Sequence, residues 1–243
     1  MWINTYFDED LRKNGIDANH YLCCIETKIF LNELNGITNL SITDLADNLL
    51  KSLQKSGLDK TPCIFITHSM GGLILKEMIK AGLNTEQIKG VVFFSTPHLG
   101  TDIFTQIAVA VSKRLIPIYK MANTEICQYS VYDEDKIDYI SQFNVTKACH
   151  QICKSDFSYF KILQDVFESK NIPNFCFIEN RKSFIFETNT FEDIVSESSA
   201  KISKEKEFNI HTKNKFHHDI QKFTSKDDED YQTFKSIILN LKI

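Results

Sequence analysis

Short apolar runs alternate with amphipathic stretches along most of the chain. A continuous apolar run is typical of a strand buried on both faces, whereas apolar residues at helical spacing are typical of a helix with one buried face. The pattern predicts strands over residues 20–30, 63–66, 90–95, 174–178 and 207–210, and helices over residues 1–14, 41–57, 73–82 and 229–241. This alternation predicts an α/β fold with a mostly parallel, doubly wound sheet and a site at the carboxyl ends of its strands.

Residues 102–170 depart from this alternation and are predicted to be mostly helical. Ile103, Ile107, Val111 and Leu115 form one apolar stripe, which ends before Pro117. An insertion of helices at this edge of the sheet is expected to form a cap over an apolar substrate, but such stripes also occur on helices that pack against the sheet. We therefore predict a single domain over residues 1–243 with a helical insertion at about 102–170. Residues 182–192 are expected to be extended, with no assigned partner.

The turn between the predicted strand 63–66 and the helix after it carries the sequence Thr67-His68-Ser69-Met70-Gly71. A serine between a strand and a helix, with small residues around it, indicates a nucleophile elbow, in which a strained turn holds the hydroxyl above the sheet. Thr67 stands where the usual pattern has glycine. The backbone N–H of Met70, at a helix N-terminus, is suited to bind an oxyanion. Ser69 is the predicted nucleophile.

A serine nucleophile needs a histidine base, and that histidine needs a carboxylate. In this class of elbow the chain order is serine, acid and histidine, so the base lies late in the chain, at His211, His217 or His218. His68 and His98 lie too early in the chain to be the base in that order. Together with Pro97, they are expected to line the site. The acid is expected after the strand 174–178, at Glu179, or before Ile194, at Glu192 or Asp193.

Composition narrows the possible partners. The chain has 243 residues, a hydrophobic fraction of 42% and a formal net charge of −4, so we expect no nucleic-acid partner.

Seven cysteines, an odd number that includes Cys23, Cys63 and Cys176, indicate buried free thiols in a reducing compartment. Cys149, His150 and Cys153 do not complete a zinc ligand set, and neither metal nor cofactor is expected. No run is long enough to span a bilayer and the first residues do not form a signal peptide, which favours an intracellular protein.

Five separated segments resemble the SERAC-type (serine active site containing) α/β-hydrolases, which are related to lipase-like domains that include GPI inositol-deacylases. The resemblance covers almost the whole chain and is carried by residues 67–72, 91–100, 177–179, 194–200 and 217–223, with Asp227, Asp228 and Tyr231 after them. It implies an α/β-hydrolase fold, with His217 as the base and Glu179 as the acid. It also implies hydrolysis or acyl transfer on lipid-like esters, peripheral membrane contact, and association with mitochondria or the endoplasmic reticulum.

The chain departs from this family at three places. The family has a strand and a His-Gly loop before a tryptophan-bearing helix, and that loop supplies a second oxyanion donor; here the corresponding helix begins at Met1-Trp2. We therefore expect an incomplete N-terminal sheet edge and weak hydrolysis. Ser196 stands in place of a proline, and Phe216 in place of an acidic residue, which indicates local drift. The function predicted first is a serine esterase or transacylase, and the alternative is a weak or inactive pseudo-hydrolase that serves as a binding or scaffold protein.

Overall fold

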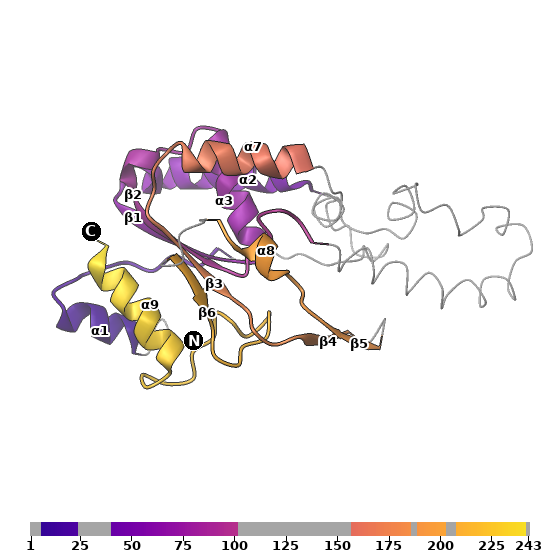
Figure 1. The fold of residues 1–243 in the computed structure, drawn as a ribbon. Coiled ribbons are helices and arrows are strands. Elements are labelled where there is room, and N and C mark those ends of the chain that lie inside the picture. The colour runs from indigo at the N-terminus through magenta and orange to yellow at the C-terminus, as the bar shows by residue number, and fades with distance from the viewer. Residues whose placement is uncertain (1–5, 24–39, 102–156, 186–188, 203–207, 242–243) are drawn as a thin grey trace, which may run out of the picture.

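The computed structural model describes residues 6–23, 40–101, 157–185, 189–202 and 208–241 (Figure 1). Within these residues the main sheet has four parallel strands in the order β1-β2-β3-β6. These strands are β1 (Cys63–His68), β2 (Ile88–Phe94), β3 (Asn174–Ile178) and β6 (Asn209–His211). The predicted α/β architecture with a parallel sheet is confirmed. Within the described residues β1 pairs with β2 alone, so it forms one edge of this sheet.

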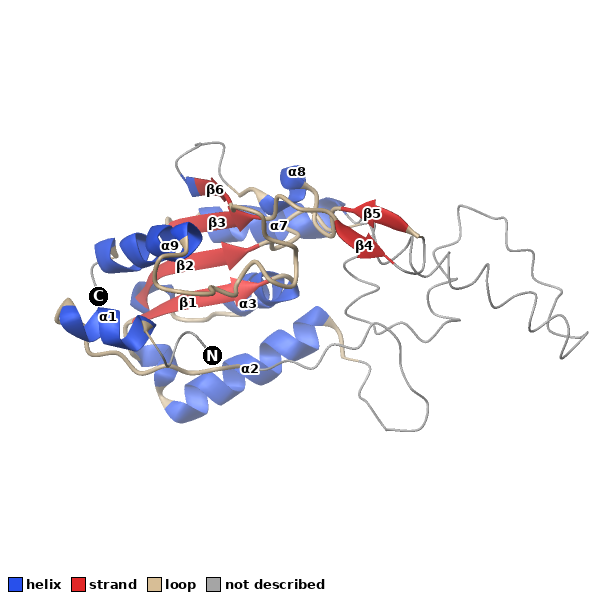
Figure 2. Cartoon of the chain, turned by 90° about the horizontal axis from the view of Figure 1, so that it is seen from below, coloured by secondary structure: helices blue, strands red, loops and turns tan. Residues whose placement is uncertain are grey.

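Helices cover both faces of the sheet (Figures 1 and 2). One face carries α2 (Ile42–Ser56), α3 (Met70–Lys80) and α7 (Phe157–Glu168), and the other carries α1 (Phe7–Lys13) and α9 (Glu229–Asn240). Strand β2 serves both layers, because alternate side chains of a strand point to opposite faces. Val91 and Phe93 pack into the first layer, and Val92 and Phe94 pack into the second. All four are fully buried, as expected for a central parallel strand.

Local signals set the helix boundaries where the sequence predicts them. Ser41 caps α2 by accepting a hydrogen bond from the Asp44 N–H, and Asp44 bonds back to the Ser41 N–H, so that both free donors are satisfied. Gly57 ends α2 in a left-handed conformation with φ of 75°, which glycine adopts without steric cost. Asp228 caps α9 by accepting bonds from two backbone N–H groups of its first turn.

A small antiparallel hairpin accounts for the extended segment between residues 182 and 192. Strand β4 (Ser183–Ile185) pairs with β5 (Thr190–Glu192), and Phe184 stands opposite Phe191. The hairpin projects beyond the carboxyl ends of the main strands (Figures 1 and 2). The helix α8 (Glu197–Ala200) follows it, and the short 3₁₀ helices η2 (Leu58–Lys60) and η3 (Thr85–Gln87) occupy two connections of the main layers.

The predicted strand at 20–30 is wrong for the part that the structure describes. Residues 20–23 have no regular structure, and Tyr21, Leu22 and Cys23 are exposed. The buried thiol expected at Cys23 is therefore also wrong, whereas Cys176 is buried. Residues 24–39, most of the predicted helical insertion and the Cys149 cluster lie outside the described residues. The described end of the insertion, α7, packs against α3 and belongs to the helical layer that covers one face of the sheet.

Candidate active site

The predicted elbow is present at the junction of β1 and α3. Ser69 has φ of 54° and ψ of −128°, a backbone conformation that residues other than glycine rarely adopt. The Ser69 N–H donates to the Phe94 carbonyl at 2.9 Å, which anchors the turn to β2. Gly72 lets the turn approach β2 closely, because a Cβ there would lie 2.3 Å from the Thr96 Oγ1. The local sequence thus holds the serine in a strained position.

Threonine fits at position 67 without a clash. A Cβ added to Gly71 would lie 3.9 Å from the Thr67 Cβ, which is ordinary van der Waals contact. The Thr67 hydroxyl also donates to the Val92 carbonyl at 3.4 Å. The glycine that the turn requires for close packing is Gly72, and the departure from the usual pattern at Thr67 leaves the elbow intact.

Three side chains from three strand ends form a continuous line of hydrogen bonds. His217, in the segment after β6, has its Nε2 3.0 Å from the Ser69 Oγ. The Nδ1 of the same ring lies 2.6 Å from the Glu179 Oε2, in the expected contact between these residues. Ser69 follows β1 and Glu179 follows β3. Such an arrangement lets the imidazole accept the serine proton while the carboxylate stabilises the resulting imidazolium.

Backbone and side-chain groups fix the Glu179 carboxylate. Its side chain is only 1% exposed. The Val195 N–H donates to Oε1 at 3.1 Å, which leaves Oε2 for His217. The Glu179 N–H donates to the Ser95 hydroxyl at 3.2 Å, and Ser95 itself has a positive φ of 40° at the end of β2. Sequence reasoning missed Ser95 and Val195, because neither residue type indicates a role in holding an acid.

The other candidates for acid and base lie elsewhere. Glu192 ends β5, and Asp193 is exposed directly after it. His211 is exposed and lies 3.5 Å from Glu197, and His218 is exposed and lies 3.3 Å from Asp219. In the described part of the chain, the carboxylate that contacts the His217 Nδ1 is therefore that of Glu179 and not that of Glu192 or Asp193.

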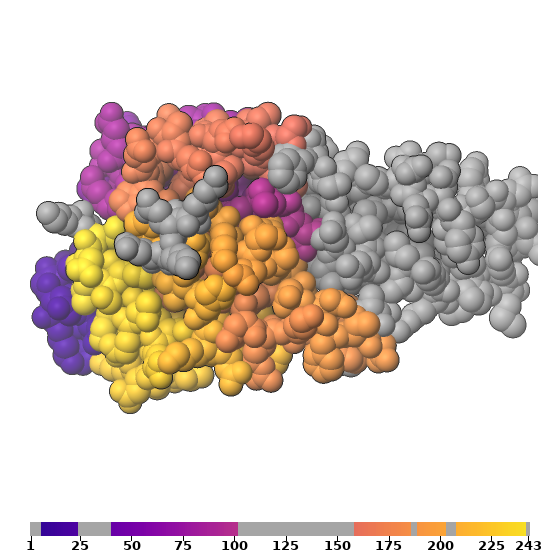
Figure 3. All heavy atoms as spheres, in the orientation of Figure 1, coloured from indigo at the N-terminus to yellow at the C-terminus, as the bar shows by residue number. Residues whose placement is uncertain are grey.

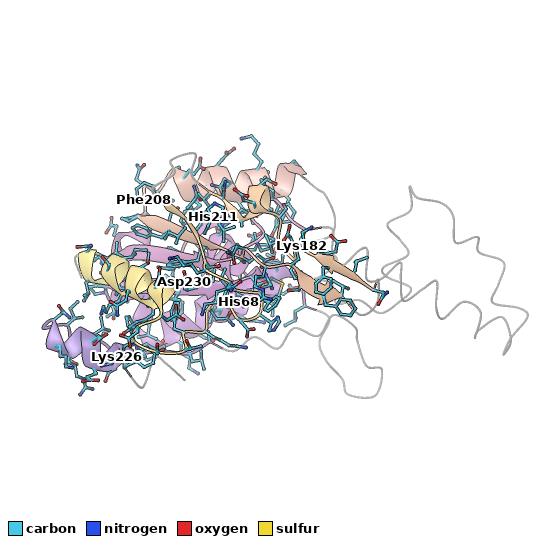
Figure 4. The ribbon with its side chains drawn as sticks, turned by 60° about the horizontal axis from the view of Figure 1, so that its bottom comes forward. His68, Lys182, Phe208, His211, Lys226 and Asp230 are labelled. Atoms are coloured by element: carbon cyan, nitrogen blue, oxygen red, sulfur yellow. The ribbon has the colours of Figure 1, made fainter. Side chains whose placement is uncertain are left out.

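The three residues expected to line the site differ from one another. His68, at the carboxyl end of β1 (Figure 4), has its Nε2 2.8 Å from the backbone carbonyl of His217. Burial lowers the pKa of His68 to about 4, so that its ring is neutral and donates to this carbonyl. The expectation for His98 is wrong: the side chain is 1% exposed and packs edge-on against Phe93, because its backbone N–H is tied to the Ser199 carbonyl. Pro97 is buried in the same loop.

The start of α3 lies directly after Ser69. Met70 is the first residue of α3, and the N–H groups of a first helical turn have no partner within the helix. Together with the positive end of the helix dipole, they favour negative charge next to Ser69. The described residues contain no group of metal-ligating side chains, and none of their helices is long and apolar enough to cross a membrane.

A parallel sheet flanked by helices, with a serine elbow at the end of one strand, defines the α/β-hydrolase fold. Among solved structures, phospholipase PlaB from Legionella pneumophila has this fold with a TM-score of 0.55 and 12% sequence identity, over 83% of this chain and 41% of that one.

Part of the chain is homologous to Protein SERAC1. It is 31% identical over 97 residues to Protein SERAC1 of Danio rerio and 34% identical over 70 residues to that of Homo sapiens. These matches cover 37% and 26% of this chain, but only 14% and 11% of the two relatives. No family model matches the chain. The comparisons therefore support the predicted SERAC-type resemblance over part of the sequence.

Proposed function

We propose that this protein is a serine hydrolase that cleaves carboxylic esters of hydrophobic, lipid-like molecules, or transfers their acyl groups. The observation that carries the proposal is the hydrogen-bonded line from Ser69 through His217 to Glu179, with spacings of 3.0 and 2.6 Å. In chain order these residues are serine, acid and histidine, as in other hydrolases with an elbow of this kind. Burying the Glu179 carboxylate costs desolvation free energy, and an imidazolium at His217 would offset that cost. Such a buried carboxylate next to a histidine is therefore consistent with a catalytic role.

The reaction that follows from this arrangement has two halves. In the first, Ser69 Oγ attacks the ester carbonyl while His217 Nε2 takes the hydroxyl proton, and the Met70 N–H binds the oxygen that becomes negative. The carbon–oxygen bond to the alcohol then breaks, and the imidazolium returns its proton to the alcohol oxygen. In the second half a water molecule, or a second alcohol in a transfer reaction, repeats these steps on the acyl-serine.

The choice of lipid-like esters rests on two supports. One is the resemblance to SERAC-type hydrolases over several motifs, and the other is an apolar cavity next to His217. The fold shared with a protein named as a phospholipase agrees with this choice but does not specify a substrate. Peripheral membrane contact and association with mitochondria or the endoplasmic reticulum remain predictions from the resemblance.

The experiment is hydrolysis of 4-nitrophenyl butyrate by purified protein and by Ser69→Ala. We expect turnover by the parent protein and a loss of about a thousandfold or more in the variant, because the hydroxyl that forms the acyl intermediate is gone. Ser52→Ala is the matched control, since Ser52 lies on the exposed side of α2 and bonds only to a backbone carbonyl. Full turnover by Ser69→Ala would contradict the proposal. Absence of turnover by folded parent protein would favour the alternative of a binding or scaffold protein.

A further inference from the structure

A cavity of about 550 Å³ lies between the β4–β5 hairpin and the segment that carries His217. Its walls include Phe184, Ile185 and Phe191 from the hairpin, Ile194 after it, and Phe216 and His217 from the opposite side. This volume falls in the range of about 300 to 1,000 Å³ that small-molecule sites have. Neither Ser69 nor Met70 is among its lining residues. The cavity therefore adjoins the base of the triad and not its nucleophile or oxyanion donor.

We propose that this cavity binds the alcohol portion of the ester, and that this portion is apolar. The inference rests on the proposed function and adds to it the side of the ester that the hairpin recognises. The hairpin would then determine which alcohols the protein releases, and the acyl chain would be bound elsewhere.

The direction of proton transfer assigns the cavity to the alcohol. During acylation the carbonyl carbon becomes bonded to Ser69 Oγ and the carbonyl oxygen faces the Met70 N–H. The ester bond breaks with its electron pair on the alcohol oxygen, and that oxygen accepts the proton held by His217 Nε2. The alcohol oxygen must therefore lie against His217. The carbon chain attached to that oxygen leaves the triad on the His217 side, where the cavity begins.

The chemistry of the walls determines what kind of alcohol fits. Phe184 and Phe191 stand opposite each other in the hairpin with ring centroids 5.0 Å apart, and they are 37% and 62% exposed. Figure 3 shows the hairpin, in orange, standing out from the body of the molecule. These rings gain burial only when something apolar covers them. Phe216 lines the other wall, and the Arg181 guanidinium, which is not a lining residue, lies 4.2 Å from the centre of its ring.

Two of the ionisable residues that line this cavity contact each other. His218 lies 3.3 Å from Asp219, and its ring stacks on Phe216. A charged alcohol would lose hydration against the aromatic rings without gaining a free partner from this pair. An alkyl or other apolar alcohol would instead bury both its own chain and the exposed faces of Phe184 and Phe191. The walls thus favour esters of apolar alcohols over esters with a charged head group.

The test uses two ester series that differ in one half of the molecule. In the first, butyrate is joined to alcohols from methanol to 1-octanol; in the second, methanol is joined to acids from acetate to decanoate. We expect kcat/KM of the parent protein to rise by up to about fourfold per methylene in the alcohol series. Phe184→Ser and Phe191→Ser should flatten that rise and leave the dependence on acyl length unchanged. Leu22→Ser is the matched control, because Leu22 is 66% exposed in the N-terminal segment and does not line the cavity.

Binding of 1-octanol, measured by calorimetry, tests the cavity without turnover. We expect 1-octanol to bind the parent protein and Leu22→Ser alike, and to bind Phe184→Ser and Phe191→Ser at least fivefold more weakly. Equal binding of 1-octanol by all four proteins, or flattening of the acyl series in place of the alcohol series, would overturn the inference. If the parent protein hydrolyses no ester yet binds 1-octanol through these two residues, the proposed function fails and the cavity assignment survives.

Discussion

Two pairs of a histidine and a nucleophile lie at the same end of the sheet, and they differ in nearly every property that matters for catalysis. In one pair, His217 lies 3.0 Å from the Ser69 hydroxyl and has a buried carboxylate on its other nitrogen. In the other pair, the His98 Nε2 lies 3.9 Å from the Cys176 thiol. The His98 Nδ1 has no hydrogen-bond partner within the described residues. A histidine next to a potentially nucleophilic side chain is therefore not enough to make such a site.

Burial explains why the second pair is inert. It raises the pKa of the Cys176 thiol to about 11 and lowers the pKa of His98 well below its usual value. Both groups are thus neutral at physiological pH, and a thiol reacts as a nucleophile only in its thiolate form. Lys76, fully buried between the Phe93 and Phe167 rings, adds a like charge that further lowers the pKa of His98. To act as a base, a histidine therefore needs both an orienting carboxylate and an accessible partner.

The largest effect is expected when the histidine of the first pair, His217, is replaced. His217→Gln should lower kcat for 4-nitrophenyl butyrate by roughly ten-thousandfold or more, because glutamine cannot take the Ser69 proton. Cys176→Ala, which removes the nucleophile of the second pair, should retain kcat within about twofold. Thermal unfolding monitored by circular dichroism confirms that both variants fold. A loss in Cys176→Ala as large as that in His217→Gln would show that the two pairs are not functionally distinct.

The next effect concerns the carboxylate that only the first pair has. Glu179→Gln should lower kcat by about a thousandfold to ten-thousandfold, because the amide does not stabilise the imidazolium and can fix the wrong tautomer. Asp193→Asn makes the same change on an exposed side chain beyond the site and should leave kcat unchanged. Steady-state kinetics at several pH values measures both. A stronger loss in Asp193→Asn would reassign the acid.

A smaller effect on kcat is expected at His68, which contacts the backbone of His217. Its ring donates to the His217 carbonyl at 2.8 Å, and through this bond it would position His217, the proposed base. His68→Ala should lower kcat by about threefold to tenfold with little change in KM, the amount that one neutral hydrogen bond contributes. His68→Gln keeps a donor near the same place and should restore most of the loss. Equal losses in the two variants would indicate a packing role instead.

The smallest effect on turnover, and a clear effect on stability, is expected at Lys76 beside the second pair. Burial lowers the Lys76 pKa to about 7, against an ordinary value of 10.5 in the unfolded chain. Between these values the unfolded chain binds more protons than the folded one, so this residue makes stability rise from pH 7 towards pH 10. Well below pH 7 the buried charge destabilises the folded protein most, although the amine donates a hydrogen bond to the Gln164 Oε1. Cys176 and Glu168 face the same amine and partly offset this cost.

Lys76→Met should therefore stabilise the protein at pH 7 by roughly 2 to 4 kcal/mol, and the gain should shrink as pH approaches 10. Urea unfolding at pH 7 and at pH 9.5 measures both parts of this prediction. Lys51→Met removes an exposed lysine on α2 and should change stability by less than about 0.5 kcal/mol at either pH. A stability gain that does not depend on pH would mean that methionine merely packs better.

The sequence predicted the first pair better than the second, for a physical reason. Ser69 stands in a local pattern of strand, turn and helix, which neighbouring residues determine, so its place could be predicted. The contact of Glu179 with His217 joins residues that are 38 positions apart, and the place of Glu179 after a predicted strand left Glu192 and Asp193 open until the family resemblance favoured it. The burial of His98 depends on how the loop after β2 meets α8, through a bond to the Ser199 carbonyl that no local pattern encodes.

The fold shows the same division between local and distant determinants. The described strands of the main sheet, and helices such as α2 with its Ser41 cap and Gly57 end, follow from hydrophobic period and capping residues. The composition of residues 20–30 favours a strand, yet residues 20–23 have no regular structure. A strand also needs a neighbouring strand that satisfies its backbone groups, and the composition of one segment does not encode that neighbour. The antiparallel partner of β4 also could not be assigned from period alone.

Reaction of the folded protein with a fluorophosphonate probe, followed by mass spectrometry of its peptides, tests most directly that Ser69 and His217 form an activated pair. Such a probe reacts with an activated serine hydroxyl and not with an ordinary one. We expect a single adduct on the peptide that contains Ser69, no adduct at Cys176, and no labelling after heat unfolding or in His217→Gln. Folded protein without an adduct at Ser69, or labelling of His217→Gln at the parent rate, would contradict it.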